Sequence, residues 1–180
     1  MSAKEENGTP ARRWRSQCDT TYKRGAAYLS GVGLIEDWGC GMAYLQRLVP
    51  AGCYRGIDVR PSAGCRVVAD LAAYTSAVDG IFLRHVLEHD LRWRHILRNA
   101  LTSFRHRMVL VVSTPFVRAT EEHHRVEGAA AGVLVPEIRF CRRDLIREFG
   151  ALPFRLEENI STDSPFGREH VFYLCKDGQA

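Results

Sequence analysis

Short apolar segments alternate along this chain with segments of helical spacing, and this alternation limits the fold more than any other feature. Seven segments are typical of strands, at residues 33–37, 54–58, 66–70, 78–83, 108–112, 154–160 and 170–175. The run 108–112 is apolar throughout, as in a central strand that is buried on both faces. The alternation predicts a mainly parallel sheet that is covered on both faces.

The segments between these strands complete the outline. Helices are predicted over residues 12–29, 91–104 and 142–149, with short helical stretches at 42–48 and 71–76. Residues 117–137 are expected to be irregular. Because only a polar turn separates the last two strands, these two should be antiparallel. The predicted fold is therefore α/β, a Rossmann-like seven-stranded mostly parallel sheet with an antiparallel last strand and helices on both faces.

The length of 180 residues corresponds to about one domain. We expect residues 1–11 to be a disordered lead-in and residues 12–180 to form a single domain, in which residues 12–30 form an N-terminal lid helix. A hydrophobic fraction of 46% with 26% charged residues excludes a disordered or collagen-like chain. The absence of a long apolar run or a secretory signal predicts no membrane segment and a cytoplasmic location.

Charge and cysteine content limit the classes of function. A net charge of +4 permits contact with nucleic acid without favouring it. None of the six cysteines forms a C-x-x-C pair, so zinc binding and thioredoxin-like redox chemistry are disfavoured. Glu121 and Glu122 beside two histidines fit no compact metal motif, and we predict no metal site.

Acidic residues end the first three predicted strands, where a ligand is expected in a parallel sheet. Asp37 is followed by Gly39 and Gly41, which let the backbone approach a ligand closely. The carboxylate of Asp58 can accept hydrogen bonds from both hydroxyls of a ribose. Asp70 can accept from the amine of an adenine, with the N–H of Leu71 facing a ring nitrogen. Each feature also has a purely structural reading, as a tight turn or a cap.

Tyr44 stands where the dinucleotide fingerprint G-x-G-x-x-G would place its third glycine. A bulky side chain there would crowd a pyrophosphate. The loop therefore fits a ligand without a phosphate bridge, and a nicotinamide-dependent dehydrogenase is disfavoured.

Four segments together resemble the successive signatures of class I S-adenosylmethionine-dependent methyltransferases. They are D-x-G-x-G at 37–41, G-I-D at 56–58, A-D-L at 69–71 and L-R-H-V-L-E-H at 83–89. The resemblance covers roughly residues 30–175 and implies S-adenosyl-L-methionine as the cofactor. Ala43 departs from the pattern, because many members of this family have glycine there.

The resemblance also implies the cofactor contacts. Asp37 would hold the methionine amino group, Gly39 and Gly41 would face the methionine and ribose, and Asp58 would bind the ribose hydroxyls. Asp70 and Leu71 would contact the adenine. Arg84 and His85 would lie under the cofactor, where the fourth strand ends.

Methyl transfer to a hydroxyl needs a base, and histidine suits that role near neutral pH. His89 is the candidate because it lies just past the fourth strand; the alternative is a histidine that only packs against the end of the sheet. Tyr22, His123 and His124 are predicted to contact the acceptor. We expect a small-molecule acceptor, a sugar or hydroxylated metabolite methylated on oxygen. The alternatives are a non-catalytic binding or scaffolding protein of this fold, or an RNA methyltransferase that uses the basic N-terminal helix.

Overall fold

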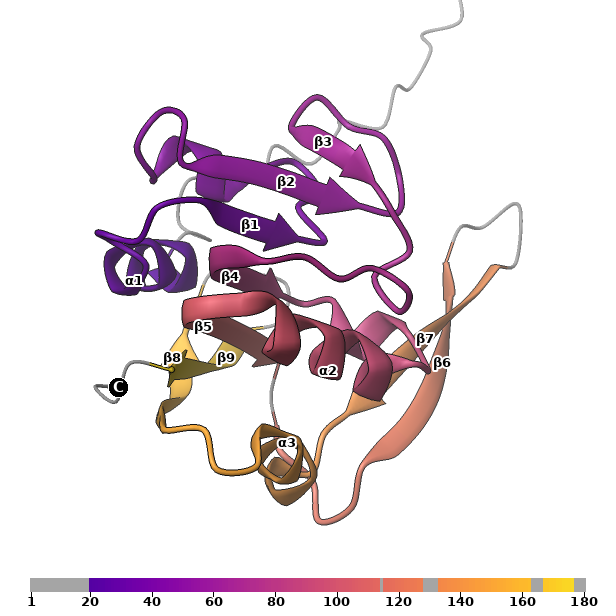
Figure 1. The fold of residues 1–180 in the computed structure, drawn as a ribbon. Helices are drawn as coiled ribbons and strands as arrows, with labels where there is room; N and C mark the ends of the chain where they lie inside the picture. The colour runs from indigo at the N-terminus through magenta and orange to yellow at the C-terminus, as the bar shows by residue number, and fades with distance from the viewer. Residues whose placement is uncertain (1–19, 114, 128–132, 163–166, 177–180) are drawn as a thin grey trace, which may run out of the picture.

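The seven predicted strands are all present, and they form one sheet in the order β3-β2-β1-β4-β5-β9-β8 (Figure 1). The computed structural model describes residues 20–113, 115–127, 133–162 and 167–176. The strands of the sheet are β1 (Ile35–Trp38), β2 (Tyr54–Asp58), β3 (Cys65–Val68), β4 (Val78–Arg84), β5 (Phe104–Ser113), β8 (Phe154–Ser161) and β9 (Arg168–Cys175). Strands β1 to β5 pair in parallel, whereas β9 is antiparallel to both β5 and β8. The predicted sheet is thereby confirmed.

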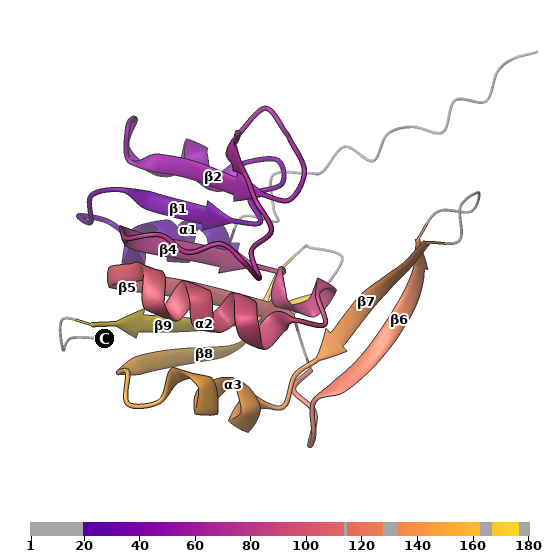
Figure 2. The same cartoon turned by 45° about the vertical axis from the view of Figure 1, so that its right-hand side comes forward.

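Helices cover both faces of the sheet, as predicted (Figure 2). The helices are α1 (Thr20–Tyr28), α2 (Trp93–Ser103) and α3 (Arg142–Phe149). Side chains alternate along β5, so that Met108 and Leu110 share a core with α2 and α3, whereas Val109 and Val111 share a core with residues of α1. This double burial explains why the sequence of β5 is apolar at successive positions.

The predicted helical stretch at 71–76 is wrong, because residues 71–73 form a turn and residues 74–76 have no regular secondary structure. The Asp70 side chain accepts a hydrogen bond from the N–H of Ala72 at 3.0 Å, and the Asp70 carbonyl accepts from Ala73 at 2.9 Å. This local turn replaces the first turn of a helix. The stretch predicted at 42–48 is reduced to one short 3₁₀ turn, η1 (Tyr44–Arg47).

The expectation of an irregular segment at 117–137 is also wrong. Strands β6 (Glu121–Glu127) and β7 (Val133–Arg139) form a separate antiparallel hairpin. The hairpin extends from the side of the molecule toward which the arrowheads of β1 and β2 point (Figure 1). The sequence of β6 is polar and lacks the apolar pattern by which a strand is recognised. Pro136 in β7 is tolerated because both strands of a two-stranded hairpin are edge strands.

The predicted lead-in at residues 1–11 and the first part of the predicted helix at 12–29 lie outside the described residues, as does the boundary drawn between them. From Thr20 onward the predicted N-terminal helix is present as α1. Within the described ranges, none of the helices has the length and apolar character needed to cross a membrane.

Candidate functional site

The parallel register brings the predicted ligand-binding segments to one edge of the sheet. Trp38 at the end of β1 pairs with Ile57 of β2 and with Leu83 of β4. The residues that follow these strands therefore lie side by side. Strand order reverses between β1 and β4, which is where open α/β sheets bind their ligands.

The loop after β1 adopts left-handed backbone conformations that glycine favours. The φ angles are +73° at Gly39 and +48° at Gly41. The N–H groups of Gly39 and Cys40 both donate to the carbonyl of Ile57, at 2.8 and 3.1 Å, and so fix the loop on β2. A Cβ on Gly41 would meet no atom of the described residues within 4 Å, so the backbone there borders open space. Gly41 can therefore approach a ligand closely.

Ala43 adopts a left-handed backbone conformation, which glycine favours. Many members of the family that the sequence resembles have glycine at this position. Its φ is 54° and its ψ is 43°, just before η1. For a residue with a Cβ this conformation costs roughly 1–2 kcal/mol. A Cβ on Gly64 would lie 2.0 Å from the Ala43 methyl, so the two residues are packed in close contact. The strain lies next to the candidate ligand site, where strained backbone is often found.

Asp37 is a carboxyl group buried at the centre of this edge, with 3% of its surface exposed. Tyr54 donates a hydrogen bond from its hydroxyl to Asp37 Oδ2 at 3.0 Å. Burial raises the pKa of Asp37 to about 7, and the negative charge of Asp58 contributes to this increase. A carboxylate in this position would be stabilised by a cation. Sequence reasoning missed Tyr54, because nothing in its position within β2 identifies it as a partner of Asp37.

Asp58 and the glycine loop are brought together, as predicted. Asp58 Oδ2 accepts from the N–H of Gly41 at 2.9 Å, and Oδ1 accepts from the N–H of Arg60 at 3.0 Å. Each carboxylate oxygen has further lone pairs, so Asp58 can hold the loop and still accept from ligand hydroxyls.

Exposed apolar side chains flank this pair of segments. Met42 is 76% exposed directly after Gly41, and Val59 is 64% exposed directly after Asp58. Large apolar side chains exposed on either side of a polar site are typical of a site that contacts the flat face of a ligand. Neither residue was predicted from the sequence.

Asp70 was predicted to end the third strand, but β3 ends at Val68 and Asp70 lies two residues beyond it, with its carboxylate already engaged. Arg92, just before α2, binds it through two nitrogens at 2.7 and 3.1 Å. These hydrogen bonds lower the pKa of Asp70. The side chain of Leu71 is buried in the core shared with α2 and α3, so that only its backbone could face an adenine.

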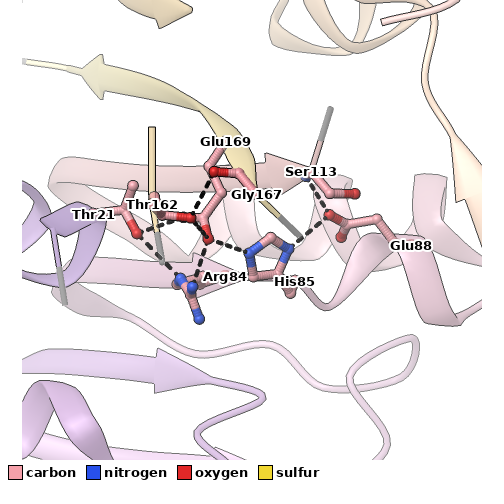
Figure 3. A network of polar contacts seen from close by, with 8 residues as sticks. All are labelled: Thr21, Arg84, His85, Glu88, Ser113, Thr162, Gly167 and Glu169. Carbon is pink, nitrogen blue, oxygen red and sulfur yellow. Dashed lines mark hydrogen bonds and ion pairs between the residues drawn. The ribbon is translucent and has the colours of Figure 1, made fainter. Parts of the chain in front are cut away.

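Arg84, the last residue of β4, and His85, which follows it, belong to a buried charge network (Figure 3). Glu169 of β9 is fully buried and accepts from Arg84 at 2.7 Å and from the hydroxyl of Thr21 at 2.6 Å. His85 Nε2 lies 3.1 Å from Glu169 Oε1, and His85 Nδ1 lies 3.1 Å from Glu88 Oε1. The imidazole is therefore held between two carboxylates. Its backbone has a φ of 52°, which is unusual for histidine.

The network favours a charged histidine. Burial alone lowers the pKa of His85, but the hydrogen bonds to Glu169 and Glu88 outweigh burial and the net pKa is raised. Burial would raise the pKa of Glu169, but His85, Arg84 and Thr21 together lower it to about 2. One arginine and one imidazolium thus balance two glutamates.

Sequence reasoning missed both glutamates of this network. Glu169 lies between Arg168 and His170 at the polar start of β9, just before the predicted strand at 170–175, so the local sequence does not mark it as buried. Glu88 lies within the segment 83–89 that carries the family resemblance, and its Oε1 also accepts from the N–H of Ser113 at 2.7 Å.

His89 lies at the end of a short 3₁₀ turn, η2 (Leu87–His89), beside the hairpin. Its Nδ1 is 3.2 Å from the carbonyl oxygen of Pro136 in β7. Because a carbonyl only accepts hydrogen bonds, the neutral ring carries its proton on Nδ1 and leaves a lone pair on Nε2. This is the tautomer that a general base acting through Nε2 requires.

The three predicted acceptor contacts occupy different surroundings. Tyr22 of α1 is half-buried, stacks on Phe82 at 5.3 Å and lies under the Arg84 guanidinium at 4.6 Å. Burial raises its pKa to about 12. His123 and His124 are exposed on β6, and His123 Nε2 lies 3.1 Å from Glu121 Oε2. Among the residues described, no three His, Cys, Asp or Glu side chains are grouped so that they could hold a metal ion.

The architecture is similar to that of several solved methyltransferase structures. The 1,6-didemethyltoxoflavin-N1-methyltransferase of Burkholderia thailandensis superposes with a TM-score of 0.68, covering 91% of this chain and 80% of that chain at 13% identity. The magnesium protoporphyrin IX methyltransferase of Synechocystis PCC 6803, with S-adenosylhomocysteine bound, gives 0.63 over 86% and 81% at 17% identity. An S-adenosylmethionine-dependent methyltransferase of Mesorhizobium loti gives 0.62 over 89% and 99% at 14% identity.

No family model matches the sequence, and no curated protein matches it significantly. At these identities the comparison concerns architecture. The strand order, the antiparallel β9 and the placement of the glycine loop agree with the resemblance in the sequence. The chain therefore has the class I fold of S-adenosylmethionine-dependent methyltransferases.

Proposed function

We propose that this protein is an S-adenosylmethionine-dependent methyltransferase. The observation that carries the proposal is the buried carboxyl of Asp37 beside the open backbone of Gly41, with Asp58 joined to the same loop. A buried carboxyl with a raised pKa suits a ligand that brings a positive charge. S-adenosylmethionine carries such a charge on its amino group, and its ribose supplies two hydroxyl donors.

The residues present fit this cofactor. Asp37 would pair with the amino group, Gly39 and Gly41 would border the methionine and ribose, and Asp58 would accept from the ribose hydroxyls. Val59 and Met42 would contact the adenine ring. When bound, S-adenosylmethionine supplies a methyl group on a sulfonium, which is already activated for in-line attack.

Asp70, Leu71, Arg84 and His85 keep their proposed places near the cofactor, with modified roles. Asp70 would contact the adenine amine only alongside its pairing with Arg92, and Leu71 would contribute its backbone. Arg84 and His85 would support the end of β4 from the buried charge network instead of contacting the cofactor through free side chains.

We further propose that the acceptor is a small polar molecule in the cytoplasm, methylated on a hydroxyl oxygen. The lone pair on His89 Nε2 supports this proposal, because it can take the proton that a hydroxyl loses as the methyl group arrives. Tyr22, His123 and His124 are the proposed acceptor contacts. Tyr22 lies on α1, and His123 and His124 lie on β6.

Asp37 makes the proposed cofactor affinity depend on pH. Since its pKa is about 7 and the pairing with an ammonium group requires the carboxylate, lowering the pH from 7.5 to 5.5 should weaken S-adenosylmethionine binding roughly 25-fold. Asp37→Asn should bind weakly at both pH values and lose this dependence. Isothermal titration calorimetry checks both results, and a wild-type affinity that is constant between the two pH values would contradict the pairing.

The stability of the ligand-free protein separates this effect from damage to the fold. Because the pKa of Asp37 is raised, the folded state holds a proton that the unfolded chain releases, so Asp37 destabilises the protein progressively as the pH rises from about 4 to about 7. Asp37→Asn should therefore be more stable than the wild type at pH 7.5. Denaturant unfolding without cofactor measures this difference.

His89→Ala should lower the rate of methyl transfer by about 10²–10⁴, the usual contribution of a general base, with little change in cofactor affinity. The assay follows labelled methyl groups from S-adenosylmethionine into a small-molecule extract. His95→Ala, an exposed histidine on α2, is the matched control and should transfer at the wild-type rate. Equal rates for the His89 and His95 variants would exclude His89 as the base. Cofactor binding without any transfer would instead favour a non-catalytic binding protein.

A further inference from the structure

A hollow lies away from the glycine loop, between residues 116–118, which follow β5, the start of α3 and strand β8. Its volume is about 390 Å³. Three arginines, Arg118, Arg142 and Arg143, line it together with Glu158 and the ring of Phe116. The strand order places β8 at the opposite edge of the sheet from β3, so this cavity is separate from the site around Asp37 and Asp58.

The charges of this cavity are not balanced. Glu158 pairs with Arg142 at 2.7 Å. Over the part of the chain that is described, no carboxylate lies within ion-pair distance of Arg118 or Arg143, and both side chains are exposed. One glutamate against three arginines leaves a net charge of about +2 around this open hollow, which attracts an anion.

The position of the arginines adds to this preference. Arg142, Arg143 and Asp144 occupy the first turn of α3, where the positive end of the helix dipole favours the acidic residue and disfavours the two arginines. The Thr120 hydroxyl accepts from the N–H of Cys141 at 3.1 Å, so the helix start is partly capped. Asp144 and Glu158 offset part of the positive charge at this helix start, and an anion bound beside Arg143 would offset more of it.

The hollow is also lined by an aromatic ring. Phe116 stacks on His170 with the ring centroids 3.7 Å apart and the planes 8° from parallel. His170 is 2% exposed, and its Nδ1 accepts from the N–H of Asn159 at 3.3 Å. Asn159 lies in a β-bulge of β8 with a φ of 57°, next to Glu158. Bulges often place side chains beside functional sites.

We propose that this cavity binds a small molecule that carries a phosphate or carboxylate group on an aromatic body. Arg118 and Arg143 would bind the anionic group, since guanidinium groups match both anions with paired hydrogen bonds. Phe116 would contact the aromatic part. Glu158 competes with the ligand for Arg142 and so limits affinity. The proposal does not depend on methyl transfer, because the ligand would bind in the absence of S-adenosylmethionine.

The test is a calorimetric titration of the full chain with phenyl phosphate, with benzoate and with inorganic phosphate, each at the same ionic strength. Binding of phenyl phosphate or benzoate in the millimolar range or tighter is expected. Arg118→Gln and Arg143→Gln should each weaken it about tenfold, the effect of one charge-assisted hydrogen bond. Glu158→Gln should strengthen it severalfold, because the competing carboxylate is removed.

Arg66→Gln is the matched control, because Arg66 is an exposed arginine on β3 at the far edge of the sheet. It should leave the affinity unchanged. Whichever of phenyl phosphate and benzoate binds more tightly identifies the anionic group. The proposal is overturned if neither binds, if inorganic phosphate binds as tightly as phenyl phosphate, or if Arg66→Gln weakens binding as much as Arg143→Gln. All four substitutions are at exposed positions, so the variants should fold.

Discussion

Asp58→Ala is expected to weaken S-adenosylmethionine binding by a factor of about 10² or more. Under the proposed function, the substitution removes the acceptor of two ribose hydroxyls, and hydrogen bonds to a charged group contribute roughly 1.5–3 kcal/mol each. It also removes the acceptor of the Gly41 N–H, which positions the glycine loop. Calorimetric titration of the variant with S-adenosylmethionine and with S-adenosylhomocysteine measures the loss.

Asp79→Ala controls for the general effect of losing a strand-end carboxylate. Asp79 lies at the start of β4 and accepts a hydrogen bond from the N–H of Leu34 at 2.9 Å. Asp58 accepts from Gly41 in a similar way, but Asp79 is at the amino ends of the parallel strands and Asp58 is at their carboxyl ends. The Asp79→Ala variant should retain the wild-type affinity for S-adenosylmethionine. If Asp58→Ala bound S-adenosylmethionine as tightly as the wild type, the ribose-binding role of this residue would be refuted.

Glu169→Ala is expected to destabilise the protein by about 3–5 kcal/mol, because it leaves buried positive charge without its partner. Arg84, His85 and Thr21 all contact this carboxylate (Figure 3). For a chain of this length, the melting temperature should fall on the order of 10 °C. Glu157→Ala, which removes a partly exposed partner of Arg24 and Arg155, should cost less than about 1 kcal/mol.

The same carboxylate predicts the acid sensitivity of the fold. The pKa of Glu169 is lowered to about 2 in the folded protein, so its stabilising contribution is complete above the ordinary pKa near 4.5 and is lost as the pH falls from there toward 2. Glu169→Ala should lack this part of the acid transition in denaturant unfolding at pH 2–5. Equal stability losses for Glu169→Ala and Glu157→Ala would show that the buried network contributes no more than a surface ion pair.

The sheet could be predicted from the sequence because burial leaves a local pattern. The continuous apolar run of β5 and the acid at the end of β2 each report their surroundings within a few residues. Parallel pairing then places Asp58 beside the glycine loop without any knowledge of side-chain contacts. Gly39 and Gly41 were identifiable for the same reason, since a sharp turn after a strand requires them.

The remaining features depend on contacts between distant residues. Glu169 joins Thr21 and Arg84 across 148 and 85 positions of sequence, and no local pattern encodes that convergence. The hairpin formed by β6 and β7 was missed because β6 is polar, β7 contains a proline, and the two strands pair with each other outside the main sheet. The turn after Asp70 was missed because a side-chain hydrogen bond competes with helix formation at its first step.

The connections between β1 and β4 contain little helix, and this affects how the molecule responds to a ligand. Throughout residues 39–77, all of which are described, η1 is the only helical element. The half of the sheet that carries Asp37 and Asp58 therefore has the thinnest cover and should open most readily in local unfolding. A ligand held there stabilises the region with the least support of its own. Occupancy should therefore slow amide exchange chiefly in β2 and β3, tightening the fold as well as filling the site.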